Sequence, residues 1–190
     1  MPVTEKLKYH LRRNANLNEQ QLDKIIKHFK PKNISRNTVL LSEGDVCKEF
    51  YFVNKGIIRT YYITKEGQEK TRYIACAGSF VTALSSFISQ QSSFEFVDTL
   101  EEAELFAISH SDFFKLLKEI PEWNEFYRTL LEMAYLFQNK KIENLVTLTA
   151  KQRYEVILTE TPSYVQQLSN KILSSYLDIT PETLSRLKSK

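Results

Sequence analysis

The sequence predicts an α+β fold: an antiparallel β-roll (a double-layered barrel) flanked by helices, then one long helix and a small helical domain. Three observations support this prediction. Short segments rich in β-branched and aromatic residues fill the chain from Lys32 to about Ile108. The stretch from Glu122 to Leu148 contains no glycine or proline. Three short helical patterns then follow from Ala150 onward.

The composition is that of an ordinary globular protein. With 190 residues, 42% of them hydrophobic and 26% charged, the chain can bury a core without disulfides or metals. Its formal net charge of +3 is only mildly basic. Cys47 and Cys76 lack ligand spacing, and we expect both to be buried thiols. The N-terminal segment has no apolar core typical of a secretion signal, and no stretch is apolar enough to span a membrane, so we expect a cytoplasmic location.

The first half of the chain predicts two helices followed by the roll. Residues 5–29 carry apolar side chains at helical spacing, with a break between Asn14 and Asn18 and with Asn18 as candidate N-cap. All the glycines of the chain lie in the β-rich region, at intervals of 12, 11 and 11 residues. Glycine supplies the positive φ angles of tight turns, so this rhythm predicts regularly spaced hairpins. These turn residues are Gly44, Gly56, Gly67 and Gly78.

The long helix is predicted to contact more than one surface. Helical spacing returns over residues 109–120 and again beyond Pro121. In the long helix, apolar residues surround the first half more than a single stripe would, so several sides must be covered. We expect one side to face the roll and another to face a second copy of the chain; a helix buried wholly within one subunit is the alternative. The expected homodimer contacts are Phe126, Leu130, Met133 and Phe137.

The closing segment predicts a helix-turn-helix. A helix over residues 170–177 is followed by a tight turn at Asp178 and Ile179, then by a second helix with Thr180 as N-cap and Pro181 in its first turn. Arginine can pair with guanine, glutamate can accept from the cytosine amino group, and helix N-termini suit phosphates. The alternative is that these charges serve only solubility. The candidate contacts to double-stranded DNA are Thr180, Pro181, Glu182, Thr183, Arg186 and Lys188.

The string SSYLDITPETLSR resembles the helix-turn-helix core of the Crp/Fnr family of transcription regulators, and AGSFVTALSSF resembles its β-roll. The resemblance covers nearly the whole chain. It implies a cyclic-nucleotide-binding-like effector domain over residues 1–120, a dimerisation helix over 121–149 and a wingless helix-turn-helix domain over 150–190. It also implies four partners: double-stranded DNA, a second copy of the chain, an unidentified small-molecule effector and RNA polymerase.

The resemblance also assigns roles on the second helix. Asp178 stands in the turn where the family usually has glycine, which predicts a slightly strained left-handed residue. After the second helix the chain has no residues for the β-hairpin wing of longer relatives, so dimerisation is expected to matter more for affinity. The implied contacts are Pro181, Glu182 and Arg186 for bases, and Thr180 and Thr183 for phosphates.

The expected effector pocket lacks the groups that bind a cyclic nucleotide. The Gly-Glu-Leu of cyclic-AMP responders falls on residues 82–84 and their Arg-Ser on residues 93–94, so the glutamate and the arginine are both missing. A charge-assisted hydrogen bond contributes about 1.5–3 kcal/mol, so losing the arginine weakens binding about tenfold to 150-fold. We expect no binding of cyclic AMP at physiological concentration. A pocket for a neutral or aromatic effector would comprise Gly78, Thr82, Ala83, Leu84, Ser85, Ser92, Ser93 and Phe94.

Enzymatic and metal sites are not predicted. The histidines His10, His28 and His110 share no ligand spacing, and no phosphate loop or nucleophile elbow is present. We therefore expect no metal, no cofactor and no catalysis. The alternative function is a ligand-binding or protein-interaction module whose helix-turn-helix no longer touches DNA. The weak basicity of the last 40 residues, six Lys or Arg against four Asp or Glu, keeps that alternative open.

Overall fold

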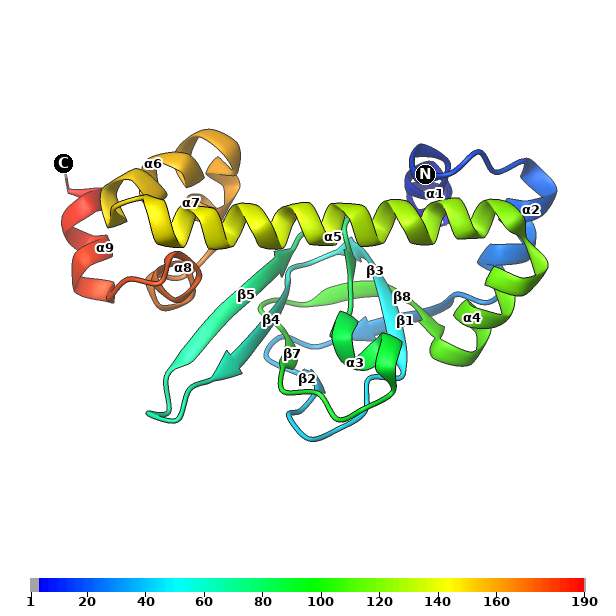
Figure 1. Ribbon diagram of the computed structural model, residues 1–190, viewed down its shortest axis with the longest axis horizontal. Coiled ribbons are helices and arrows are strands. Elements are labelled where there is room, and N and C mark those ends of the chain that lie inside the picture. Colours follow the sequence, from blue (N-terminus) through cyan, green and yellow to red (C-terminus); the bar gives the residue numbers. More distant parts are fainter. Residues whose placement is uncertain (1–3, 190) are drawn as a thin grey trace. The chain divides into compact units, whose positions relative to one another are not determined.

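The computed structural model describes residues 4–189 (Figure 1). They pack as two compact units. The first runs to Tyr62 and continues over Tyr73–Glu132, and the second combines Ile63–Arg72 with the residues from Met133 onward. The antiparallel roll with its helices confirms the predicted α+β class.

In chain order the elements are α1 (Glu5–Asn14), α2 (Glu19–Ile26), β1 (Lys30–Ile34), β2 (Val39–Leu41), β3 (Glu49–Lys55), β4 (Ile58–Ile63), β5 (Glu69–Ala75), β6 (Phe80–Val81), α3 (Leu84–Ser89), β7 (Phe96–Thr99), β8 (Ala103–Ser109), α4 (His110–Glu119), α5 (Pro121–Thr147), α6 (Ala150–Glu160), α7 (Pro162–Gln167), α8 (Asn170–Leu177) and α9 (Pro181–Lys188).

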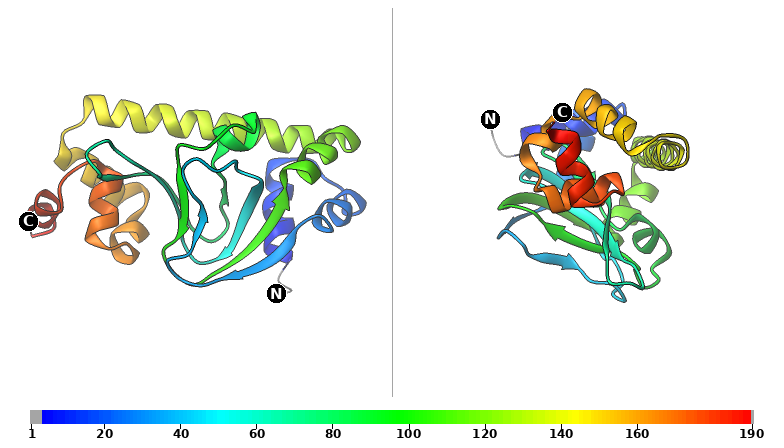
Figure 2. Two further views of the ribbon diagram at one scale, coloured as in Figure 1. Left: turned by 90° about the horizontal axis from the view of Figure 1, so that it is seen from below. Right: turned by 90° about the vertical axis from the view of Figure 1, so that its left-hand side faces the viewer.

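The described strands form two four-stranded sheets, in the orders β1-β8-β3-β6 and β2-β7-β4-β5 (Figures 1 and 2). In the first sheet β3 pairs with β8, and Phe50 lies opposite Ile108. In the second, β4 pairs with β7, and Arg59 lies opposite Asp98. Successive side chains on a strand point to opposite faces, so these registers decide which residues enter the core.

The glycine rhythm marks real turns. All the glycines have positive φ, between +77° and +98°. Gly56, between β3 and β4, shows why no other residue fits: its φ is +98°, and a Cβ there would lie 2.7 Å from the Cβ of Ala103. Both the backbone conformation and the close approach of β8 therefore require glycine at this turn.

Aromatic rings fill the core between the roll and the helices α4 and α5. The ring centroids of Phe50 and Phe113 are 5.2 Å apart, and those of Phe113 and Trp123 are 5.1 Å apart. Trp123 stacks on Phe126 at 4.5 Å and donates from Nε1 to the carbonyl of Phe113 at 3.2 Å. Both residues are at most 1% exposed. The first turns of α5 are thus anchored in the core of the first unit.

Side-chain caps define the short helices of the second unit. The Ser169 hydroxyl accepts from the backbone N–H of Ile172 at the start of α8, and the Thr180 hydroxyl accepts from that of Thr183 at the start of α9. Three leucines, one or more from each of these helices, form a small buried core. They are Leu173, Leu177 and Leu184.

Candidate functional site

The turn between α8 and α9 is held by Asp178 in the left-handed conformation, with φ 53° and ψ 50°. The backbone N–H of Ile179 donates to the carbonyl of Ser174 at 3.0 Å. Arg153 donates from Nε to the carbonyl of Leu177 at 3.0 Å. These bonds satisfy carbonyl groups that the end of α8 would otherwise leave unpaired. α8 and α9 are therefore joined by a short turn held by hydrogen bonds.

One face of α9 is buried and the opposite face is exposed. Leu184 is completely buried, whereas Glu182, Ser185 and Arg186 are exposed. Positions i, i+3 and i+4 lie on one face of a helix, so these three side chains are neighbours. We call Glu182, Ser185 and Arg186 the α9 face. Sequence reasoning named Glu182 and Arg186 but missed Ser185, although its spacing from Glu182 was a signal.

Three of the other four predicted DNA contacts, Thr180, Thr183 and Lys188, have hydrogen-bond partners within the protein. The Thr180 hydroxyl caps α9 and lies 3.2 Å from the hydroxyl of Thr183. Pro181 is exposed at the first position of α9. Lys188 donates from Nζ to Oδ1 of Asn170 on α8 at 2.7 Å. Thr180 and Lys188 thus stabilise α9 by hydrogen bonds, although both residues are also exposed to solvent.

The α9 face carries one anion and one cation. Hydrogen bonds from its own backbone N–H and from the Thr180 hydroxyl, together with the charge of Arg186, lower the pKa of Glu182. The carboxylate is therefore ionised at neutral pH and can only accept hydrogen bonds. Arg186 can only donate. Such a pair can address a cytosine amino group and a guanine edge in the major groove.

The residues expected to form the effector pocket differ in their exposure to solvent. They lie just before and just after β6, in the first turn of α3 and in the loop between α3 and β7. Thr82, Ala83 and Ser93 are buried, whereas Ser85, Ser92 and Phe94 are exposed. Leu84 and Gly78 are half-buried, and a Cβ on Gly78 would lie 2.8 Å from Nε2 of His10 on α1. The structure thus separates the expected set into buried and exposed groups.

The buried hydroxyl groups of this segment are already hydrogen-bonded within the protein. Thr82 Oγ1 lies 3.1 Å from Sγ of Cys47, and Ser86 Oγ accepts from the backbone N–H of Cys47 at 2.9 Å. Ser93 Oγ accepts from the N–H of Glu95 at 2.9 Å and donates to its carbonyl at 3.0 Å. Cys47 and Ser86 were not among the expected pocket residues, because their contact joins positions 39 residues apart.

Arg59, a buried arginine in the roll, is ion-paired with the carboxylate of Asp98. Arg59 donates to Asp98 through two nitrogens, at 3.0 and 2.6 Å, and its guanidinium lies 3.7 Å from the Tyr61 ring. Ile58 and Val97, their neighbours on β4 and β7, belong to the core, so Arg59 and Asp98 point to the other face of the sheet. A cyclic phosphate in the roll interior would therefore not meet this guanidinium.

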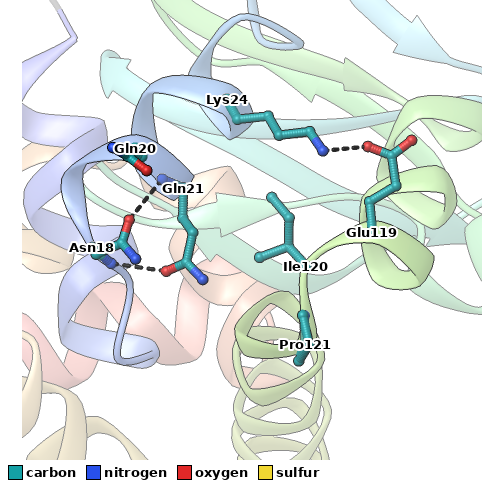
Figure 3. Close-up of a pocket in the computed structure, with 7 residues that line it drawn as sticks. All are labelled: Asn18, Gln20, Gln21, Lys24, Glu119, Ile120 and Pro121. Atoms are coloured by element: carbon teal, nitrogen blue, oxygen red, sulfur yellow. Dashed lines mark hydrogen bonds and ion pairs between the residues drawn. The ribbon is translucent and has the colours of Figure 1, made fainter.

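A surface hollow lies elsewhere, where α2 approaches the junction of α4 and α5 (Figure 3). Its volume is about 340 Å³, and four of its polar side chains are bonded in two pairs. Asn18 and Gln21 form a reciprocal capping box, and Lys24 pairs with Glu119 at 2.7 Å. It contains none of the expected pocket residues. Its lining is Asn18, Gln20, Gln21, Lys24, Glu119, Ile120 and Pro121.

The residues expected to form the dimer contact lie in different environments. Phe126 is 1% exposed and packs edge-on against Phe80 at 5.1 Å. Leu130 is partly buried against the same core, and Phe137 is half-buried. Met133 is 59% exposed. Phe126 thus belongs to the core of its own chain, because the roll covers that side of α5.

Residues 4–189 contain neither a metal-binding cluster nor a membrane-spanning helix. No group of three or more His, Cys, Asp or Glu side chains in this range is placed to hold a metal ion. Within the same range, no helix combines the length and the apolarity needed to cross a membrane.

Sequence relatives are regulatory proteins. A family model described as the cyclic nucleotide-binding domain matches residues 31–120. The chain is 26% identical over 185 residues to the anaerobic regulatory protein of Haemophilus influenzae, covering 90% of this chain and 70% of the relative. It is 27% identical over 185 residues to the fumarate and nitrate reduction regulatory protein of Yersinia pestis, covering 88% and 70%.

Solved structures show the same fold. The c-di-GMP-responsive global regulator CLP of Xanthomonas campestris superposes with a TM-score of 0.73 at 18% identity, covering 90% of both chains. FixK2 of Bradyrhizobium japonicum superposes with a TM-score of 0.71 at 16% identity, covering 85% of this chain and 83% of that one. The named relatives are regulators, not enzymes. The chain thus carries a match to the cyclic nucleotide-binding domain, and its sequence relatives and structural neighbours are transcription regulators of the Crp/Fnr type.

Proposed function

We propose that this regulator binds double-stranded DNA as a homodimer and reads bases with the α9 face. The observation that carries the proposal is the arrangement of Glu182, Ser185 and Arg186 on the exposed side of a capped, buried-core helix. In a helix-turn-helix, the N-terminal part of the second helix enters the major groove. Backbone N–H groups at the start of α9 would meet phosphates.

The dimer would form along a second apolar track on α5. Leu131, Tyr135, Gln138, Ile142 and Leu145 follow one another in steps of four and three, the heptad spacing of a coiled-coil seam. Tyr135 is 67% exposed and Ile142 is 57% exposed, although both are large and apolar. We call these five residues the α5 seam. A partner helix would cover them, and Met133, one of the expected contacts, would lie outside the seam.

A symmetric dimer explains how one short helix can achieve specificity. Two α9 helices placed about 34 Å apart would read the two halves of a palindrome. Each correct bidentate base contact contributes about 1–3 kcal/mol, and a dimer doubles the number of contacts. Regulation of transcription through such sites would bring the protein to RNA polymerase in the cytoplasm.

The roll is proposed to have lost the response to cyclic AMP. The segment from Tyr73 to Phe94 offers no charged side chain. Its buried hydroxyls are hydrogen-bonded to groups of Cys47, Glu49, Gln91 and Glu95, and Arg59 is paired with Asp98. Calorimetric titration with cyclic AMP should show no binding in the low-micromolar range. Saturable heat in that range would contradict the proposal. It would also remove the reason to expect a neutral effector in place of a cyclic nucleotide.

DNA binding is tested by selection from a pool of random duplexes at low and moderate salt. The wild type should enrich a palindrome at both salt concentrations, and Arg186→Ala should fail to enrich it. Arg36→Ala is the matched control, because Arg36 is equally an exposed arginine but lies between β1 and β2. It should enrich the same palindrome. Weak, strongly salt-dependent binding without enrichment would mean electrostatic contact only, and no binding would favour a protein-interaction module.

A further inference from the structure

The hairpin between β4 and β5 contacts α8 through the outer edge of β5. β5 is the last strand in its sheet, so its outer N–H and C=O groups have no neighbouring strand. Ser175 of α8 takes that place. Its hydroxyl donates to the carbonyl of Glu69 at 2.8 Å and accepts from the N–H of Thr71 at 2.8 Å, and it lies 2.9 Å from the Thr71 hydroxyl.

Two charged pairs flank this hydroxyl. Lys171 pairs with Glu69 at 2.8 Å, and Asp178 pairs with Lys70. Lys171, Ser175 and Asp178 follow at steps of four and three, so one face of α8 and its C-cap meets the hairpin. The hairpin residues Glu69, Lys70 and Thr71 are consecutive. The match of a helical face to consecutive strand residues makes this a continuous contact within the second unit.

The same hairpin also holds α5. Lys141 donates from Nζ to the carbonyl of Thr71 and to that of Arg72, each at 2.8 Å. Its ammonium group lies 4.2 Å from the centre of the Tyr176 ring on α8. The hairpin therefore binds α5 through Lys141 and α8 through Ser175. α8 cannot turn relative to this part of α5 without breaking one of the two sets of bonds.

We propose that residues 69–72 form a bracket that fixes the helix-turn-helix on α5, and that Ser175 and Asp178 are positioning residues for reading two DNA half-sites. The inference rests on the proposed DNA-binding dimer. α9 follows α8 through a bonded turn and shares its core through Leu184, so the two helices move together. In a dimer joined along α5, the angle of α8 on α5 sets the distance between the two α9 helices.

Asp178 has two opposing effects on stability, a strained backbone conformation and an ion pair with Lys70. A non-glycine residue with a φ of 53° is strained, and glycine would relieve that strain. Glycine would also remove the carboxylate that pairs with Lys70. The aspartate is thus explained by the bracket and not by the turn. Asp178→Gly therefore opens one contact of the bracket while leaving the turn at least as favourable.

The test compares operators with different half-site spacing. The half-site enriched by the wild type is built into duplexes in which the central spacer is shortened or lengthened by one or two base pairs. Each base pair shifts the half-sites by about 3.4 Å and rotates them by about 35°. The double variant Ser175→Ala, Asp178→Gly opens the bracket. Ser174→Ala is the matched control, since that hydroxyl donates only within α8, to the carbonyl of Lys171.

The wild type and Ser174→Ala should lose about tenfold or more in affinity when one base pair is added. The double variant should lose less than about threefold, because its α9 helices can adapt, and its affinity for the best spacer should fall. Lys70→Ala, which alters no helix-turn-helix residue, should shift the profile in the same direction. If the double variant instead shows uniformly lower affinity with the wild-type spacing profile, Ser175 and Asp178 only stabilise the fold. That result would overturn the proposal.

A measurement without DNA separates the bracket from the proposed function. In the wild type, the amide of Thr71 should exchange its hydrogen more slowly than that of Lys65 at the exposed hairpin tip, and the double variant should lose this protection. Equal exchange of the two amides in the wild type would overturn the bracket even if DNA binding holds. Protection of Thr71 in a protein that enriches no DNA would instead overturn the DNA-binding proposal.

Discussion

Replacing Lys141 by methionine should flatten the pH dependence of the stability of the second unit. The Lys141 ammonium group is packed among the carbonyls of Thr71 and Arg72 and the ring of Tyr176. Burial, aided by the positive charge of Arg72 and opposed by Asp178, lowers the pKa of Lys141 to about 7. Folding therefore penalises the charged form of this lysine.

The sign and the size follow from proton linkage. An unfolded lysine titrates near pH 10.4, so between about pH 7 and that value the unfolded chain binds more protons than the folded chain. The free energy of unfolding then rises with pH, by at most about 1.4 kcal/mol per pH unit. Stability from this group is complete above the unfolded pKa, falls as the pH is lowered and levels off below the folded pKa. Methionine cannot titrate, so this slope disappears.

Urea unfolding followed by far-ultraviolet circular dichroism measures the effect between about pH 7.5 and 9.5. The wild type should gain stability over this range relative to Lys141→Met. Lys140→Met is the matched control, because the Lys140 side chain is 56% exposed and pairs with Glu143 at 3.3 Å. It should keep the wild-type slope. Equal slopes for the wild type and Lys141→Met would refute the burial argument.

Three further outcomes are expected. Ile142→Glu should convert the dimer to a folded monomer in sedimentation, whereas Lys140→Glu, on another side of α5, should leave the dimer intact. Phe126→Ala should lower the free energy of unfolding by about 3–5 kcal/mol in denaturant titrations, because it empties a core site. Asp98→Ala should cost about 3–5 kcal/mol in the same assay, because it leaves the Arg59 guanidinium buried without its bidentate carboxylate, and Asp98→Asn should cost less.

Local signals in the sequence were sufficient for much of the fold. Asn18 and Thr180 cap their helices as expected, because a cap involves residues only two or three positions apart. Gly56 and its spacing from the other glycines located the turns, because positive φ is a property of the residue itself. The long helix was visible because nothing between Pro121 and Thr147 interrupts it.

The candidate sites could not be predicted fully, because they depend on contacts between residues far apart in the sequence. α5 has two apolar tracks, one containing Phe126 and one containing Ile142, and the sequence does not say which of them the roll covers. The hydroxyls of the expected pocket are bonded to residues such as Cys47, far away along the chain. Ser175 and Thr71 lie 104 residues apart. A polar residue in a short helix gives no sign that a strand edge will meet it.

The most direct test of base reading by α9 is a substitution scan of the enriched half-site, measured by fluorescence anisotropy at fixed salt. At one base pair the wild type should prefer its own base by about 1–3 kcal/mol. Arg186→Ala should lose the preference at that base pair and keep the preferences elsewhere. If Arg186→Ala instead weakens binding equally for every sequence, the guanidinium contacts only phosphates, and the account of α9 as the reading helix is contradicted.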